Sequence, residues 1–302
     1  MRTSRIVSWS VVAGAVTILA AQPTAGARQT RGARERTVMV TVLDHAGQNV
    51  AGLGVRDFTV RENDVAREVL RVGPATDPMQ VALLVDTSDA TQADIPDLRK
   101  GLESAATSIL AKIPQSQVAL ISFGERPTVE SDYTPNIATL QRAIQRLFSK
   151  PGSGSYLLEA IVEATQGLKK HQATRPVIVA FSSEAAPEFS NDSYQRVGEV
   201  LRDVGAELWA IVLQARSRPP NSDAERNRST VLGDVTAQSG GTRDQILVRT
   251  ALEPTFVAVA TRLTSQYAIT YSRPDSLIAP DRLDVTVTRE GLQILAPRWA
   301  GK

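Results

Sequence analysis

The sequence predicts an α/β fold in which a doubly wound parallel sheet is inserted in a small β unit. Short continuous apolar runs such as Val81–Val85 are typical of strands buried on both faces. Segments with helical apolar spacing alternate with them over residues 79–265, which favours a parallel sheet covered by helices on both faces. The flanks 37–78 and 266–302 instead show β-type alternation, and we expect them to pair, because each has too few strands to bury a core.

Length and composition indicate one large globular domain and a smaller one. The chain has 302 residues, 42% of them hydrophobic and 22% charged, which argues against wholesale disorder or a membrane bundle. The absence of cysteine excludes disulfides, zinc thiolates and cysteine nucleophiles. Two histidines leave little material for imidazole metal sites or for a Ser-His-Asp triad.

The first residues have the order of a secretory signal peptide. Arg2 and Arg5 precede the apolar run 6–21, and small residues lead up to Ala27. We therefore predict cleavage after Ala27 and a periplasmic or secreted protein without a membrane span in its mature form. The alternative is a retained anchor, which the polar residues in this short run disfavour.

The mature chain is predicted to be electrically neutral. Of 34 basic and 32 acidic residues, two arginines and no acid fall in residues 1–27. A neutral mature chain argues against nonspecific electrostatic binding to nucleic acid or anionic lipid. The basic leader 28–36 is interpreted as a solvated tail; its arginines are Arg28, Arg31, Arg34 and Arg36.

The individual elements follow from periodicity and turn residues. In the N-terminal flank we expect a strand over 37–43 and a hairpin of 58–62 and 67–72 around Asn63-Asp64. The α/β strands are predicted at 81–85, 118–123, 128–133, 176–181, 207–213 and just before Leu247. Helices are predicted at 95–112, 137–148, 156–170, 194–204, 229–239 and 253–264, and C-terminal strands at 267–271, 282–288 and 292–295.

Loops after the strands of a doubly wound sheet carry its functional residues. The first such loop reads Asp86-Thr-Ser-Asp-Ala90, and here the chain resembles the von Willebrand factor A family, whose metal-ion-dependent adhesion site opens with Asp-x-Ser-x-Ser. The segments Val50–Val60 and Leu263–Tyr271 are similar to parts of bacterial secreted proteins related to this family. The resemblance thus covers nearly the whole mature chain, and the order of its motifs is specific.

The resemblance implies a site for Mg²⁺ or Ca²⁺ whose coordination a partner's carboxylate completes. Asp86 and Ser88 match the first motif, whereas Ala90 has no side-chain oxygen. Ser155 stands where threonine is usual, and Ser183 where an acid is usual. The expected ligands are therefore Asp86, Ser88 and Ser155, and they would bind metal weakly.

Two other features leave alternatives open. Asp86 and Ser88 could instead cap the following helix and stabilise the loop. The long polar segment 216–228 follows a strand at the same edge, and we interpret it either as a functional loop or as a disordered excursion.

The leading functional hypothesis is an exported, non-catalytic module that binds an unidentified protein with the C-terminal edge of its sheet. A structural envelope component without a ligand site is the main alternative. A metal-dependent enzyme is the weaker one, because the sequence offers neither two nearby histidines nor a full set of acids.

Overall fold

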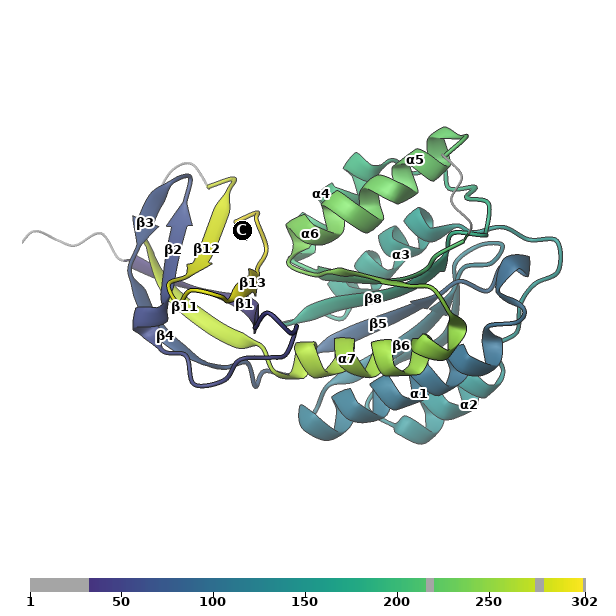
Figure 1. Ribbon diagram of the computed structural model, residues 1–302, viewed down its shortest axis with the longest axis horizontal. Coiled ribbons are helices and arrows are strands. Elements are labelled where there is room, and N and C mark those ends of the chain that lie inside the picture. Colours follow the sequence, from purple (N-terminus) through teal and green to yellow (C-terminus); the bar gives the residue numbers. More distant parts are fainter. Residues whose placement is uncertain (1–32, 216–219, 275–279, 301–302) are drawn as a thin grey trace, which may run out of the picture.

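A computed structural model describes residues 33–215, 220–274 and 280–300. The predicted signal peptide with Ala27 and the arginines Arg28 and Arg31 lie outside these residues. Two lobes are visible, an α/β domain and a smaller β lobe built from both flanks of the chain (Figure 1).

The α/β domain is built on a six-stranded sheet with the order β10-β9-β8-β5-β6-β7. Neighbouring strands are parallel except β7, which runs antiparallel to β6 at the sheet's edge. The doubly wound α/β fold is therefore confirmed, but the expectation of an entirely parallel sheet is wrong at this edge, because a short connection can only return the chain antiparallel. The strands are β5 (Gln80–Val85), β6 (Gln117–Ser122), β7 (Thr128–Thr134), β8 (Pro176–Ser183), β9 (Glu207–Leu213) and β10 (Arg243–Ile246).

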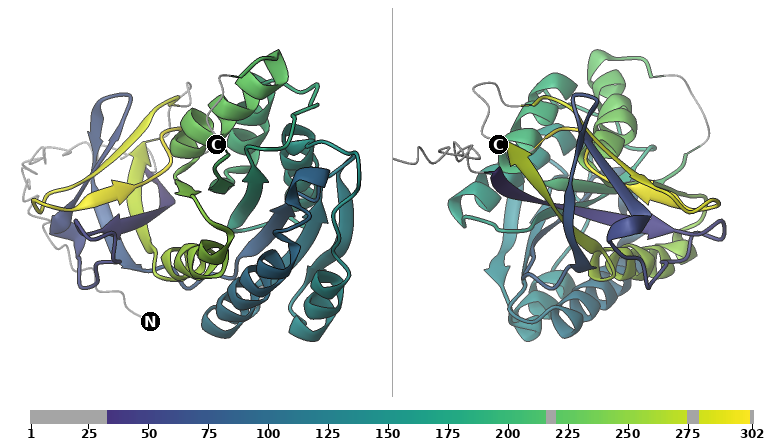
Figure 2. Two further views of the ribbon diagram at one scale, coloured as in Figure 1. Left: turned by 45° about the vertical axis from the view of Figure 1, so that its right-hand side comes forward. Right: turned by 90° about the vertical axis from the view of Figure 1, so that its left-hand side faces the viewer.

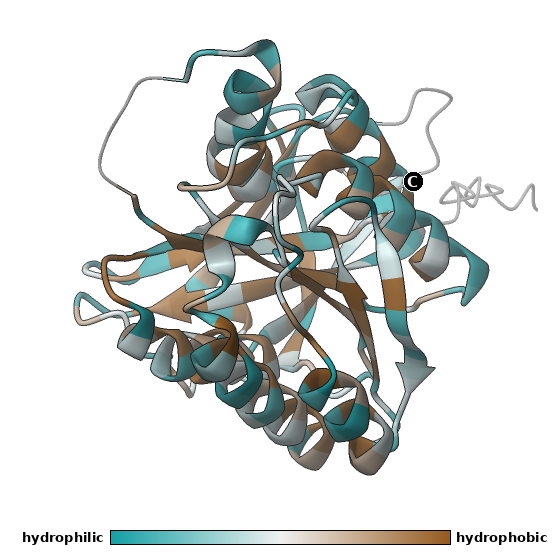
Figure 3. Cartoon of the chain, turned by 90° about the vertical axis from the view of Figure 1, so that its right-hand side faces the viewer, coloured by the Kyte–Doolittle hydropathy of each residue, from teal (hydrophilic) through white to brown (hydrophobic). Residues whose placement is uncertain are grey.

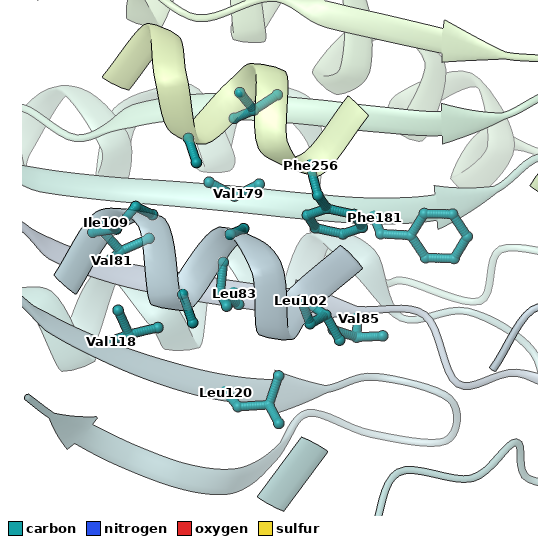
Figure 4. Close-up of a cluster of buried hydrophobic side chains, with 14 of the residues drawn as sticks. Val81, Leu83, Val85, Leu102, Ile109, Val118, Leu120, Val179, Phe181 and Phe256 are labelled. Carbon is teal, nitrogen blue, oxygen red and sulfur yellow. The ribbon is translucent and has the colours of Figure 1, made fainter. Parts of the chain in front are cut away.

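Helices cover both faces of this sheet (Figure 1). One face carries α1 (Ile95–Lys112), α2 (Ile137–Gln145) and α7 (Leu252–Thr264). Apolar side chains of β5, β6 and β8, such as Leu83, Leu120 and Val179, pack there against α1 and α7 (Figure 4). The other face carries α3 (Leu157–Lys170), α4 (Tyr194–Val204), α5 (Asp223–Thr230) and α6 (Thr236–Ser239).

The β lobe consists of two sheets that pack on each other (Figure 2). One has the order β13-β1-β11-β4 and the other β12-β2-β3, so each combines strands from both flanks. Its core lies between them and includes Val40, Val60 and Ile269. The strands are β1 (Ala33–Leu43), β2 (Phe58–Glu62), β3 (Val65–Arg67), β4 (Val69–Pro74), β11 (Tyr267–Pro274), β12 (Leu283–Val287) and β13 (Gln293–Leu295).

Three expected boundaries differ from the structure. Arg34 and Arg36 are not part of a solvated tail, because β1 begins at Ala33 and pairs with β11 along its whole N-terminal half. The expected strand 67–72 is divided at Glu68, where the chain passes from one sheet to the other. The expected helix 229–239 begins at Asp223 instead, because Ser222 caps it by accepting the Glu225 amide.

Candidate functional site

The predicted site lies where the C-terminal ends of β5 and β8 meet the loop before α3. Strand β5 ends at Val85, and Asp86 follows as a fully buried side chain. Its Oδ1 accepts the amide of Ser88 at 2.9 Å, and its Oδ2 accepts the amide of Ser183 at 3.1 Å. Asp86 therefore ties the first loop to the end of β8.

The second loop approaches the first through backbone contacts. The amide of Asp89 donates to the Ser153 carbonyl at 3.3 Å, and the amide of Lys150 donates to the Thr87 carbonyl at 2.8 Å. Ser155 is fully buried and donates its amide to the Pro187 carbonyl at 2.8 Å. The structure thus brings the three sequence-predicted loops to one edge of the sheet.

Gly124 lets the loop after β6 pack against this group. A Cβ at Gly124 would lie 2.5 Å from the Thr87 carbonyl oxygen, which is closer than a real contact allows. The Gly124 amide also donates to Thr87 Oγ1 at 3.2 Å. The close approach fixes the backbone beside Asp86, and it explains why a residue without a side chain is needed there.

Helix capping does not explain Asp86 and Ser88. The N-cap of α1 is Asp94, and no side-chain hydrogen bond caps that helix or the 3-10 turn Asp89–Thr91 that precedes it. The capping interpretation is therefore wrong for these two side chains. The same interpretation also proposed loop stabilisation, and this part agrees with the hydrogen bonds that Asp86 accepts from two backbone amides.

The predicted ligands form an incomplete cage for a divalent cation. Ser88 and Ser155 are fully buried, and their hydroxyls lie beside the carboxylates of Asp86 and Glu188, with which neither makes a hydrogen bond of good geometry. Ser183 contributes its amide rather than a carboxylate, and Ala90 contributes no oxygen. In the described residues no three acidic, histidine or cysteine side chains group closely enough to hold a metal. The residues present do not fit a charged, hard-ion cage.

Glu184 faces away from this centre. Its Oε1 accepts a hydrogen bond of 2.6 Å from Arg243, a residue of β10, and both side chains are partly exposed. The pair lines a polar surface pocket of about 370 Å³ together with residues of α5. Glu184 therefore belongs to the neighbouring pocket and does not replace the acid missing at Ser183.

Two further charged residues lie at this edge: Glu188, which was not anticipated from the sequence, and Arg228, the last residue of the polar segment 216–228. Glu188 is 3% exposed, and its Oε1 accepts the Leu157 amide at 3.1 Å and the Ser190 hydroxyl. Burial raises the pKa of Glu188 to about 7, although the Ser190 hydroxyl and the charge of Arg228 lower it. Burial also raises the pKa of Asp86. The position of Glu188 in the loop after β8 is the one signal that the sequence offers for it, whereas Arg228 lies on α5.

Comparison with known proteins gives a family match for the central part of the chain. Residues 81–185 match the family model of the von Willebrand factor type A domain. No curated protein matches the chain in sequence.

Solved structures with similar folds are distant in sequence. Proximal thread matrix protein 1 from the mussel byssus has a TM-score of 0.52 at 13% identity, covering 68% of this chain and 50% of that one. The vWF domain of the type V pili tip protein Mfa5 from Porphyromonas gingivalis has a TM-score of 0.47 at 12% identity, covering 63% and 96%. A von Willebrand factor type A protein from Catenulispora acidiphila has a TM-score of 0.48 at 9% identity, covering 90% and 75%.

Proposed function

We propose that this chain, which belongs to the von Willebrand factor type A domain family through residues 81–185, is an exported, non-catalytic module that binds a protein partner. The binding face is the C-terminal edge of the α/β sheet, on the side away from the β lobe (Figure 3). The observation that carries the proposal is a set of exposed apolar side chains on the loops of this edge.

These side chains come from three separate loops. Leu247 and Val248 directly follow β10 and are 74% and 58% exposed. Phe189, in the loop after β8, is 51% exposed and contacts Tyr156 in a tilted arrangement with 6.0 Å between ring centroids. Phe148, in the loop before α3, is 65% exposed. Large apolar and aromatic residues are costly to leave in water, and such residues dominate the energetics of protein interfaces.

Asp86, Ser88 and Ser155 take a supporting part in this proposal. They are the oxygen donors that remain from the family's metal site, and any Mg²⁺ or Ca²⁺ they hold is bound weakly, because affinity follows the number and charge of the ligands. Since all three are buried, partner recognition rests on the loops around them rather than on direct coordination.

The burial of these three side chains also favours a second candidate, a structural envelope component without a ligand site. In that case the edge would bind no discrete partner. The apolar side chains on its loops argue for the first function.

Photo-crosslinking in the producing cell distinguishes the two. A photoreactive amino acid replaces Phe189 or Val248 at the edge, and matched controls replace Val257 in α7 or Val65 in β3, which are 38% and 54% exposed. The binding function predicts a discrete protein adduct from the edge positions and none from the controls. Adducts of equal yield from all four positions, or from none, would reject it.

Export is proposed from the order of charged, apolar and small residues in 1–27. In the described part of the chain no helix is both long and apolar enough to cross a membrane. Intact-mass measurement on protein from the producing cell's envelope should show a chain that begins at Arg28. A mass that retains Met1 would overturn the export proposal.

A further inference from the structure

We infer that Arg228 is the resident cation of this site: its guanidinium supplies, from within the chain, the positive charge that a divalent ion supplies in the A-domain family. The edge then needs no metal to hold its shape. The effect of Arg228 on partner binding rests on the proposed function. Its effect on metal binding can be measured on the isolated chain.

The position of Arg228 supports this assignment. It lies on α5, and its side chain is 8% exposed. Nη1 donates a hydrogen bond of 2.8 Å to the Ala186 carbonyl and lies 3.6 Å from Glu188 Oε2. A guanidinium stays protonated in proteins, so a full positive charge sits beneath the loop that follows β8.

Buried charges need partners, and those of Arg228 are the acids of the site. Glu188 is the nearest, with its Oε2 3.6 Å from Nη1. Asp86, fully buried, is tied to the same loop, because its Oδ2 accepts the Ser183 amide and the Ser183 carbonyl accepts the Ala186 amide. Arg243, a neighbouring arginine on β10, is paired with Glu184 instead. Arg228 is therefore the cation that pairs with Glu188 and holds the loop to which Asp86 is bound, while a further buried acid, Glu225, lies one turn before it on α5.

The same position opposes a second cation. A metal bound by Asp86, Ser88 and Ser155 would share the local negative charge with a guanidinium already present, and like charges at short range repel strongly where water is excluded. The missing acid at Ser183 removes the charge that would otherwise favour the metal. The departures from the family motif and the charge of Arg228 thus act in the same direction, since both disfavour a bound metal.

Arg228 also positions part of the proposed binding face. Its carbonyl partner Ala186 is in the loop that carries Phe189. This loop is held from its other side by Ser155, whose amide donates to Pro187 and whose carbonyl accepts the Phe189 amide at 2.9 Å. Arg228 and Ser155 together fix the backbone from which the exposed Phe189 ring projects.

Calorimetric titration of the mature chain with MgCl₂ tests the assignment. Arg228→Gln removes the charge but keeps a donor for the Ala186 carbonyl, and it should bind Mg²⁺ at least about tenfold more tightly than the parent, because a competing positive charge is removed beside the acids of the site. Arg228→Lys keeps the charge and should behave like the parent. Arg226→Gln is the matched control, since Arg226 is exposed on the same helix and pairs with Asp223.

The assignment is overturned if folded Arg228→Gln binds Mg²⁺ no better than the parent. If Arg228→Gln does not fold, the melting temperatures of the parent and of Arg228→Lys test the assignment instead. EDTA should leave both melting temperatures unchanged, because the guanidinium already supplies the charge, and a fall of the parent's melting temperature in EDTA contradicts the assignment. Neither readout involves a partner, so a failed crosslink at Phe189 and a failed metal titration remain separate results.

Discussion

The hydroxyl of Tyr271 donates a hydrogen bond of 2.8 Å to Oε1 of Glu62, which joins the two flanks of the chain across 209 positions. Glu62 is fully buried and also forms ion pairs with Arg67 and Arg273. Tyr271 comes from the four-stranded sheet and Glu62 from the three-stranded one, so the contact spans the core of the β lobe.

Replacing Tyr271 with phenylalanine should lower the free energy of unfolding by about 1–3 kcal/mol, because a buried carboxylate loses one of its donors while the ring's packing is kept. Urea denaturation measures this loss. Tyr194→Phe removes a hydroxyl from a residue that is 38% exposed and serves as the matched control. Equal stabilities of the two variants would show that the contact contributes nothing.

Removing the C-terminal flank 266–302 should expose the N-terminal flank. Strand β1 pairs with β11 on one side and with β13 on the other, and both partners belong to that flank. Hydrogen exchange should therefore show lost protection of the amides in Val38–Leu43, while the α/β domain keeps its circular dichroism. Unchanged protection in β1 would mean that the two flanks do not form one folding unit.

Glu207 should make stability fall as pH rises. It is 5% exposed, and its Oε2 accepts hydrogen bonds from Trp209 Nε1 at 3.0 Å and Gln266 Nε2 at 2.8 Å. Burial raises its pKa above the ordinary 4.5 despite the opposing charge of Arg175. The native state thus binds more protons than the unfolded one once the pH exceeds 4.5, and stability is lost up to the native pKa.

The measurement compares the chain with Glu207→Gln by urea denaturation at several pH values. The stability advantage of the parent over the variant should shrink as the pH rises above 4.5. An advantage that stays constant or grows with pH would contradict this sign.

Restoring the missing ligands should restore metal binding. The double change Ala90→Ser and Ser183→Asp adds a hydroxyl and a carboxylate to the remaining donors, so calorimetry should show tighter Mg²⁺ binding, and the gain should be larger when Arg228→Gln is also present. Adding Asp86→Ala should abolish it. If the double variant binds no better than the parent, the three loops do not converge as proposed.

Local patterns were sufficient for most of the α/β domain. The helix 95–112 was predicted with the boundaries of α1, because its apolar stripe is uninterrupted, and the strand at Val81–Val85 differs from β5 by one residue. The start of α5 was missed although a signal was present. Ser222 and Glu225 have the spacing of a capping box, and reading them would have placed the helix start correctly.

Features that depend on distant pairing could not be predicted. The extension of β1 through Arg34 and Arg36 depends on β11, more than 200 positions away. The antiparallel direction of β7 is a different case, because the short connection from β6 already implies it. The site shows the same limit. Asp86, Ser88 and Ser155 were found from their motif, whereas the approach of Arg228 to Glu188 joins residues 40 positions apart that no local pattern relates.

The most direct test of the proposed function is the amount of the crosslinked partner that the immobilised mature chain retains, with and without EDTA. The double variant Phe189→Ser and Leu247→Ser should retain at least about tenfold less than the parent, since 1.4 kcal/mol of lost apolar contact suffices for that change. The control Val257→Ser with Val65→Ser should retain the parent's amount, and EDTA should change neither result. Equal retention by both double variants, or loss of the partner in EDTA, would contradict metal-independent binding through this edge.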